Sequence, residues 1–131
     1  MTIADLGKKY KLDGKVDLWK CHDNWILTHD AVTKIAHMER IKLSRIESIY
    51  QSETSCRFLI TMIKEDKEGV VIDSVTSVGE ADTRNSKNNY YGSMAEKRGI
   101  DRCVLKLINA YEFGVYSEVE ADDFKKESKW K

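Results

Sequence analysis

Three β-rich runs separated by short polar turns constrain this sequence more than any other feature. The runs cover residues 43–51, 56–64 and 70–80, and β-branched or aromatic residues are frequent in each of them. The connecting segments, SETS and EDKEG, are too short for a crossover, so consecutive runs must pair antiparallel. The sequence therefore predicts a three-stranded antiparallel β-meander.

Helical patterns lie on both sides of the predicted meander. Before it, Thr28 is a suitable N-cap for a helix over 29–39, where apolar residues recur at helical spacing. After it, Ser93 and Glu96 have the spacing of a capping box, and an apolar stripe continues over 100–111. These patterns predict a helix before the meander and a long packed helix after it, which together form a β-β-β-α core.

Two glycines affect how the long helix is expected to pack and end. Gly99 lies in the middle of this helix, where glycine costs roughly 1 kcal/mol relative to alanine, so another backbone is expected to approach it closely. Gly114 is suited to cap the helical region at its C-terminal end. A short last helix is expected from Ser117, with Glu120 completing a second capping box.

These elements predict one α+β domain over residues 1–131. An N-terminal segment, 1–25, holds a helix over 3–10 and a loop that carries both Trp19 and Trp25. The core covers 26–114, and the segment 115–131 is the short helix, acidic at its start and basic at its end, as the helix dipole prefers.

The composition argues against a disordered chain, a membrane-spanning chain and a disulfide-linked framework. Charged residues make up 34% of the chain and hydrophobic ones 41%, which is typical of a globular domain. No apolar run approaches 18 residues and no signal-like core follows the first residues, so we expect no membrane span. The three cysteines, Cys21, Cys56 and Cys103, form an odd and widely spaced set, which favours reduced thiols in a cytoplasm.

The charges are unevenly distributed although the net charge is zero. Between residues 84 and 106 there are six basic residues and two acidic ones, whereas 112–124 holds five acids and no lysine or arginine. Arg98, Arg102 and Lys106 recur every fourth residue, so they share one face of the predicted helix. Such a row can follow a phosphate backbone, and the alternative interpretation is an ordinary solvated face.

The loop before this helix adds further candidates for nucleic-acid contacts. Arg84 and Lys87 can bind phosphate, and Tyr90 and Tyr91 can stack on bases, at about 1–3 kcal/mol per base. In the alternative interpretation one of the tyrosines belongs to the core.

Catalytic and metal centres have less support in the sequence. His22, His29 and His37 are dispersed and match no zinc spacing, and no serine or cysteine has a recognisable catalytic setting. We therefore expect no catalytic residue, no metal and no cofactor. Asp73 and Glu80, with a lysine nearby, leave open a metal-dependent nuclease. Asp101 is expected to form a structural ion pair with a neighbouring cation.

Three segments of the chain resemble a known family. They are WILTHDAVTKIAHMERI, the SVGEA that ends the meander, and MAEKRGIDRCVLKLINAYEFGVYSEVEADDF. Over residues 25–124 the chain resembles a group of small phage proteins related to single-strand annealing proteins of the Erf type, and to the eukaryotic recombination mediator with the same core. Gly99 stands where the family pattern usually has alanine, and this chain is shorter than typical annealing proteins.

The resemblance implies a function in DNA recombination without enzymatic chemistry. Members of the family bind single-stranded DNA in a groove between the sheet and the long helix, assemble side by side into rings or filaments, and anneal complementary strands without ATP. By position, the resemblance and the stacking argument together give these expected DNA-binding residues: Arg57, Lys64, Arg84, Lys87, Tyr90, Tyr91, Arg98, Arg102 and Lys106.

The implied partners are single-stranded DNA and further copies of the same chain. The acidic segment 112–124 is suited to contact the basic face of a neighbouring copy. The implied location is the cytoplasm, that of a bacterial host if a phage encodes the protein. The alternatives to this function are the metal-dependent nuclease and a phage protein-interaction module that does not bind DNA.

Overall fold

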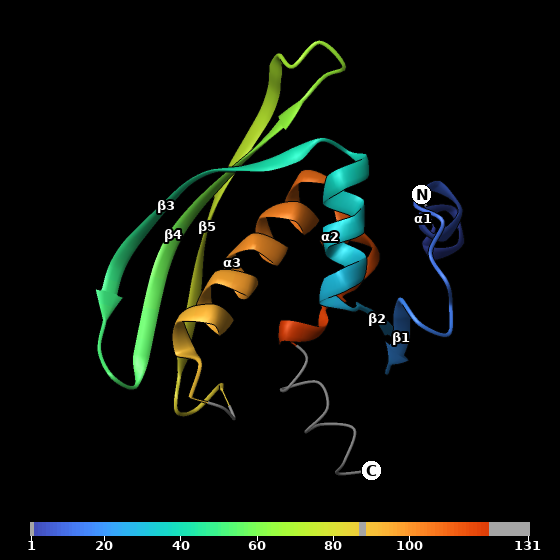
Figure 1. The fold of residues 1–131 in the computed structure, drawn as a ribbon. Helices are drawn as coiled ribbons and strands as arrows, with labels where there is room; N and C mark the ends of the chain where they lie inside the picture. Colours follow the sequence, from blue (N-terminus) through green and yellow to red (C-terminus); the bar gives the residue numbers. More distant parts are fainter. Residues whose placement is uncertain (1, 87–88, 121–131) are drawn as a thin grey trace.

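A computed structural model describes residues 2–86 and 89–120 of the chain (Figure 1). The larger sheet consists of β3 (Ile41–Gln51), β4 (Ser55–Glu65) and β5 (Val71–Asp82), in that spatial order and antiparallel throughout. The predicted meander is therefore confirmed.

Helices cover one face of this sheet. α3 (Tyr91–Leu107) lies along β5 and β4, and α2 (His29–Met38) packs against α3 (Figure 1). Thr28 caps α2 as predicted, since its hydroxyl accepts a hydrogen bond from the backbone N–H of Ala31 at 3.1 Å. Within the described residues no helix packs on the opposite face of the sheet, which we call the outer face.

A second sheet was not predicted. It consists of β1 (Leu18–Cys21), β2 (Asn24–Leu27) and β6 (Val115–Ser117), in the order β1-β2-β6, with β2 and β6 parallel. The expected loop around the two tryptophans is thus wrong, because Trp19 and Trp25 lie on paired strands. The described residues form an α+β fold with two three-stranded sheets instead of a single meander.

The helix ends differ from the prediction in three places. α3 begins at Tyr91 with no side-chain cap, so the capping box at Ser93 and Glu96 is wrong. Gly114, at a φ of +70°, caps the 3₁₀ helix η1 (Ala110–Phe113) and not the long helix. No α-helix starts at Ser117, which ends β6 and is followed by the 3₁₀ helix η2 (Glu118–Glu120). The rest of that expected helix lies outside the described residues.

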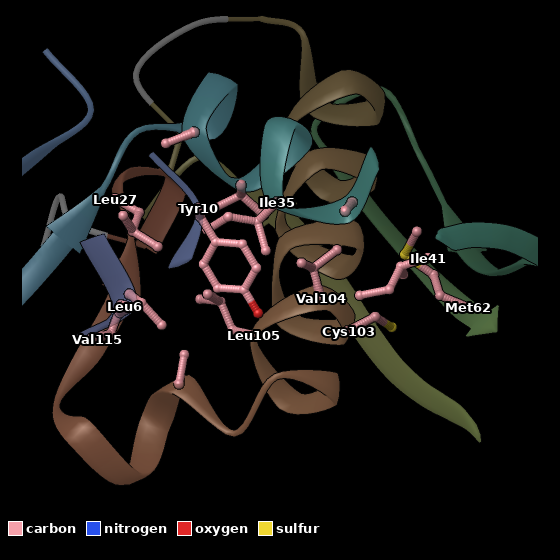
Figure 2. Packing of buried hydrophobic residues seen from close by; sticks show 14 of the residues in the cluster. Leu6, Tyr10, Leu27, Ile35, Ile41, Met62, Cys103, Val104, Leu105 and Val115 are labelled. Carbon is pink, nitrogen blue, oxygen red and sulfur yellow. The ribbon is translucent and has the colours of Figure 1, made fainter. Parts of the chain in front are cut away.

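The core lies between α2, α3, the larger sheet and the N-terminal helix α1 (Ile3–Lys9), which was predicted and is confirmed. Figure 2 shows Tyr10 and Leu6 of this N-terminal part packed towards Leu105 and Val104 of α3. The burial of these apolar side chains fixes α3 against the sheet. In the part of the chain that the structure describes, no helix is long and apolar enough to cross a membrane.

Candidate nucleic-acid interface

Arg98 is buried, with only 3% of its surface exposed. Its Nε donates to the backbone carbonyl of Val119 at 2.9 Å, and its Nη1 donates to the backbone carbonyl of Glu80 and to Oδ1 of Asn85, both at 2.9 Å. Its Nη2 donates to the backbone carbonyl of Asn85. The guanidinium therefore joins three segments of the chain and has no free surface to offer a phosphate.

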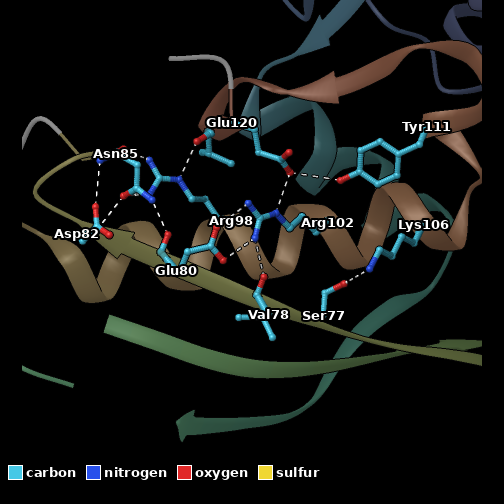
Figure 3. Close-up of polar contacts among 11 residues, drawn as sticks. Ser77, Val78, Glu80, Asp82, Asn85, Arg98, Arg102, Lys106, Tyr111 and Glu120 are labelled. Atoms are coloured by element: carbon cyan, nitrogen blue, oxygen red, sulfur yellow. Dashed lines mark hydrogen bonds and ion pairs between the residues drawn. The ribbon is translucent and has the colours of Figure 1, made fainter. Parts of the chain in front are cut away.

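Arg102 is engaged in a similar way on the next turn of α3 (Figure 3). It forms two hydrogen bonds to the carboxylate of Glu80, at 2.8 and 2.9 Å, and one to the backbone carbonyl of Val78 at 2.7 Å. Glu120 accepts a further bond at 3.2 Å. Burial alone would lower the pKa of Arg102, but the bonds and charges of Glu80 and Glu120 outweigh it and raise that pKa.

These two arginines close the free edge of β5. β5 is an edge strand, and the carbonyls of Val78 and Glu80 accept from Arg102 and Arg98 at 2.7 and 2.9 Å. Lys106 continues the row, and its Nζ donates to the hydroxyl of the buried Ser77 at 2.7 Å. The row that the sequence suggested as a phosphate track is therefore a set of bonds between α3, the edge of β5 and the C-terminal segment 118–120.

The loop between β5 and α3 holds both exposed and packed candidates. Arg84 is exposed and pairs with Asp82 at 3.1 Å; hydrogen bonds from Arg84 are the main reason that the pKa of Asp82 is lowered. Tyr90 has 72% of its surface exposed, whereas Tyr91 packs against the cluster around Ala95, as the core alternative for one tyrosine requires. Lys87 lies outside the described residues.

The two hairpin candidates lie on opposite faces of β4. Lys64 pairs with Glu39 at 2.7 Å on the side of the helices, so it is tied to the end of α2. Arg57 is exposed on the outer face, in register with Tyr50 of β3 and Glu80 of β5.

Four exposed side chains belong to segments that meet at one end of the larger sheet, which we call the loop end; two of them lie on the outer face, and Tyr90 precedes α3 on the side of the helices. β3 and β5 end here and β4 begins here, since Gln51 is in register with Cys56 and Ser55 is in register with Asp82. Tyr91 packs against residues of the same end, which brings the neighbouring Tyr90 there. The exposed residues of the loop end are Tyr50, Arg57, Arg84 and Tyr90. Of the nine predicted residues, the structure brings three together here.

Tyr50 was missed by the sequence interpretation. Its register with Arg57 was the signal that could have revealed it, because directly opposed residues of an antiparallel pair share a face. That register follows from the short turn between β3 and β4, since Gln51 is in register with Cys56 and the backbone N–H of Ser52 donates to the carbonyl of Ser55.

A buried carboxylate forms a second polar cluster, away from the loop end. Asp101 is fully buried and bonds to Nδ1 of His29 at 2.8 Å and to the hydroxyl of Ser117. The hydrogen bond to Asp101 raises the pKa of His29, while burial raises the pKa of Asp101. The expected structural ion pair of Asp101 thus has His29 as its partner, and not a neighbouring cation.

This cluster joins α2, α3 and β6 and does not resemble a hydrolytic triad. In a triad the serine donates to the imidazole, whereas here Ser117 and His29 both bond to the carboxylate. The backbone N–H of His29 also donates to Glu118 at 2.7 Å. The arrangement is therefore suited to holding the start of α2 against the C-terminal segment.

The nuclease alternative needs two carboxylates to converge, and they do not. Asp73 and Glu80 are an odd number of positions apart, seven, along a regular part of β5, so they lie on opposite faces of the sheet. Glu80 is also bonded to Arg102. Within residues 2–86 and 89–120, no three histidine, cysteine or acidic side chains lie close enough to hold a metal ion.

Comparisons with protein-family models, with curated proteins and with solved structures find no match to this chain. The resemblance to the phage annealing proteins therefore stays a prediction.

Proposed function

We propose that the protein binds single-stranded DNA at the loop end of its larger sheet. The observation that carries the proposal is the gathering of two exposed tyrosines, Tyr50 and Tyr90, with two exposed arginines, Arg57 and Arg84. Aromatic rings accept unpaired bases of any sequence, and arginines hold the phosphates between them.

The proposed mechanism is positional and uses neither ATP nor a metal. The strand would run across the loop end, with its phosphates near Arg57 and Arg84 and its bases stacked on the tyrosines. Arg84 is paired with Asp82, so a phosphate competes with that carboxylate. Because two arginines would each neutralise a phosphate, we expect binding to weaken as the salt concentration rises.

Annealing of complementary strands is the second part of the proposal. A base that stacks with its face on an exposed tyrosine keeps its hydrogen-bonding edge open. A second strand can pair with that edge, which is the condition for annealing. The three cysteines are buried and form no disulfide with one another, which agrees with the reducing, cytoplasmic location that we propose. If the chain does not bind DNA at all, a protein-interaction module is the remaining alternative.

The test is the binding of a fluorescent oligo(dT) at several salt concentrations. We expect Arg57→Ala to reduce the slope of log affinity against log salt by about 1, and Tyr90→Ala to weaken binding at every salt concentration. Lys67→Ala is the matched control, because Lys67 is an exposed cation in the turn between β4 and β5, away from the loop end. Annealing is measured separately, from the rate at which two complementary oligonucleotides pair.

Two outcomes would overturn the proposal. One is the absence of binding at low salt, which would favour the protein-interaction module. The other is an equal loss of affinity in Arg57→Ala and Lys67→Ala, which would show non-specific attraction. Arg98→Ala is not a useful test of this site, because Arg98 is buried and bonded within the chain.

A further inference from the structure

β3 is exposed to an unusual degree for a strand of its length. It spans Ile41–Gln51, and every residue of it after Ile41 is exposed. Since β3 is the first strand in the order β3-β4-β5, one of its edges has no partner within the described residues. Leu43, Ile46 and Ile49 are 41–53% exposed along it. A long edge strand with exposed apolar side chains is a template for pairing with another strand.

The opposite edge of the same sheet is closed over the C-terminal half of β5. The backbone carbonyls of Val78 and Glu80 on β5 already accept hydrogen bonds from Arg102 and Arg98. A second copy that placed its β3 on this edge would have to break those bonds. Head-to-tail growth of the sheet along the whole of β5 is therefore disfavoured, and pairing of like β3 edges is favoured.

We infer that β3 pairs with β3 of a second copy, antiparallel, around a two-fold axis at Ile46. Residues directly opposite each other in an antiparallel pair lie on the same face of the sheet. Ile46 lies on the side of the helices and Glu47 on the outer face, as their partners Ile60 and Leu59 on β4 show. An axis between Ile46 and Glu47 would place Ile46 directly opposite Glu47 of the second copy, although the two lie on different faces, so this axis is excluded. The axis must therefore lie at a residue that is opposite its own counterpart in the second copy.

The charges of β3 select which residue lies on the axis. An axis at Arg45 would place Arg45 opposite its own copy, and an axis at Glu47 would do the same with two carboxylates; both arrangements are destabilising. An axis at Ile46 places Arg45 opposite Glu47 of the second copy, and Glu47 opposite Arg45, on the outer face. These pairs lie in the regular part of β3, between its two irregularities, and they would add to the ion pair that Arg45 and Glu47 form within each copy.

The same register also buries apolar surface. Ile46 of each copy would meet at the axis on the side of the helices, where α3 lies over β4 and β5 and leaves β3 open. The result is a six-stranded sheet with β5 at both ends, and each of those ends is closed by arginines. Such a pairing is complete at two copies, so it differs from the rings or filaments that the resemblance implies.

The inference is tested by sedimentation equilibrium without DNA, which keeps it separate from the proposed function. We expect the wild-type chain to be a dimer at micromolar concentration. Arg45→Glu places carboxylates opposite each other, and Glu47→Arg places guanidinium groups opposite each other, so each variant alone is expected to be a monomer. An equimolar mixture of the two variants is expected to form a heterodimer, because each restores the opposite charge to the other. The double variant, which reverses both pairs, is expected to be a dimer again.

The controls separate a lost interface from a lost fold. Both side chains are on the surface, with 71% and 47% of Arg45 and Glu47 exposed, so far-UV circular dichroism should be unchanged in each variant. Lys67→Glu is the matched charge reversal away from β3 and should leave the dimer intact. A wild-type monomer, a larger assembly, or a mixture of the two single variants that stays monomeric would each overturn the inference. Capture of a strand from another protein by a monomeric chain would likewise overturn it.

Discussion

Gly79 on β5 and Gly99 on α3 lie against each other so closely that no side chain fits between them. A β carbon at Gly79 would lie 1.9 Å from the backbone oxygen of Ala95 and 2.6 Å from the backbone nitrogen of Gly99. A β carbon at Gly99 would instead meet Cδ1 of Ile60 at 2.4 Å, which is the movable end of a side chain. The close approach expected at Gly99 is thus confirmed, and it brings Arg98 within reach of the strand edge.

Alanine substitutions at these glycines should therefore have unequal effects. We expect Gly79→Ala to lower the free energy of unfolding by about 3 kcal/mol or more, because rigid backbone must move. Gly99→Ala should cost about 1 kcal/mol, since the displacement of Ile60 is partly offset by the better helix propensity of alanine. Gly92→Ala, in open space on α3, should be neutral or slightly stabilising. Urea denaturation measures all three, and similar values for Gly79→Ala and Gly92→Ala would contradict the close contact.

Loss of Arg98 should affect stability first. Arg98→Ala leaves the backbone carbonyls of Glu80 and Val119 without their donor, so we expect a loss of about 3 kcal/mol in the free energy of unfolding. Lys106→Ala, which removes an exposed cation and one bond to Ser77, should cost about 1 kcal/mol. Thermal denaturation ranks the two variants. An Arg98→Ala protein of unchanged stability that no longer binds DNA would return Arg98 to the interface.

The bond between His29 and Asp101 predicts a pH-dependent stability. The pKa of His29 is raised by this hydrogen bond in the folded state, opposed by burial and by Lys97 and supported by Asp30. Its contribution should be complete below the ordinary pKa of about 6.5 and should be lost as the pH rises through the raised value. Wild type should thus lose stability relative to His29→Gln as the pH rises above about 6.5. A constant difference across that range would show that His29 does not titrate.

The three cysteines should be protected in the folded protein. Cys21, Cys56 and Cys103 are all buried, and burial raises the pKa of the Cys103 thiol, which lowers its reactive thiolate fraction. We expect a disulfide reagent to modify the native protein more than about a hundredfold more slowly than the protein in urea. Absorbance of the released thiolate gives both rates. One rapidly modified thiol in the native protein would show that one of these side chains is accessible.

The elements that the sequence predicted well are those with strong local signals. The meander follows from β-rich runs and short turns, and α2 follows from an apolar helical pattern with Thr28 at its start. β1, β2 and β6 have three or four residues each, too few for a clear alternation, and Trp25 on β2 finds its partner at Val115. Two strands that lie this far apart in the sequence leave no local pattern that would predict their pairing.

The cationic row shows where sequence periodicity stops being informative. The spacing of Arg98 and Arg102 places them on one face of α3, but it does not indicate whether that face meets solvent or the edge of a strand. Two glycines gave a better signal for the surroundings of this helix face. Gly79 lies in the third β-rich run, and Gly99 lies between Arg98 and Arg102. Together these glycines indicate that the helix lies on the strand itself, which puts long side chains of α3 within reach of its carbonyls.

The dependence of the fold on residues 115–120 has a consequence for how the chain folds during synthesis. β6, which belongs to this segment, pairs with β2. The backbone carbonyl of Val119 accepts a hydrogen bond from the buried guanidinium of Arg98, and the carboxylate of Glu118 accepts one from the backbone N–H of His29. A nascent chain that has reached only α3 contains the whole meander and its covering helix, but the buried Arg98 and Asp101 each still lack one partner, Val119 and Ser117. We therefore expect folding to be completed late and in one step, so chaperones and proteases would encounter an incomplete chain until residue 120 has emerged from the ribosome.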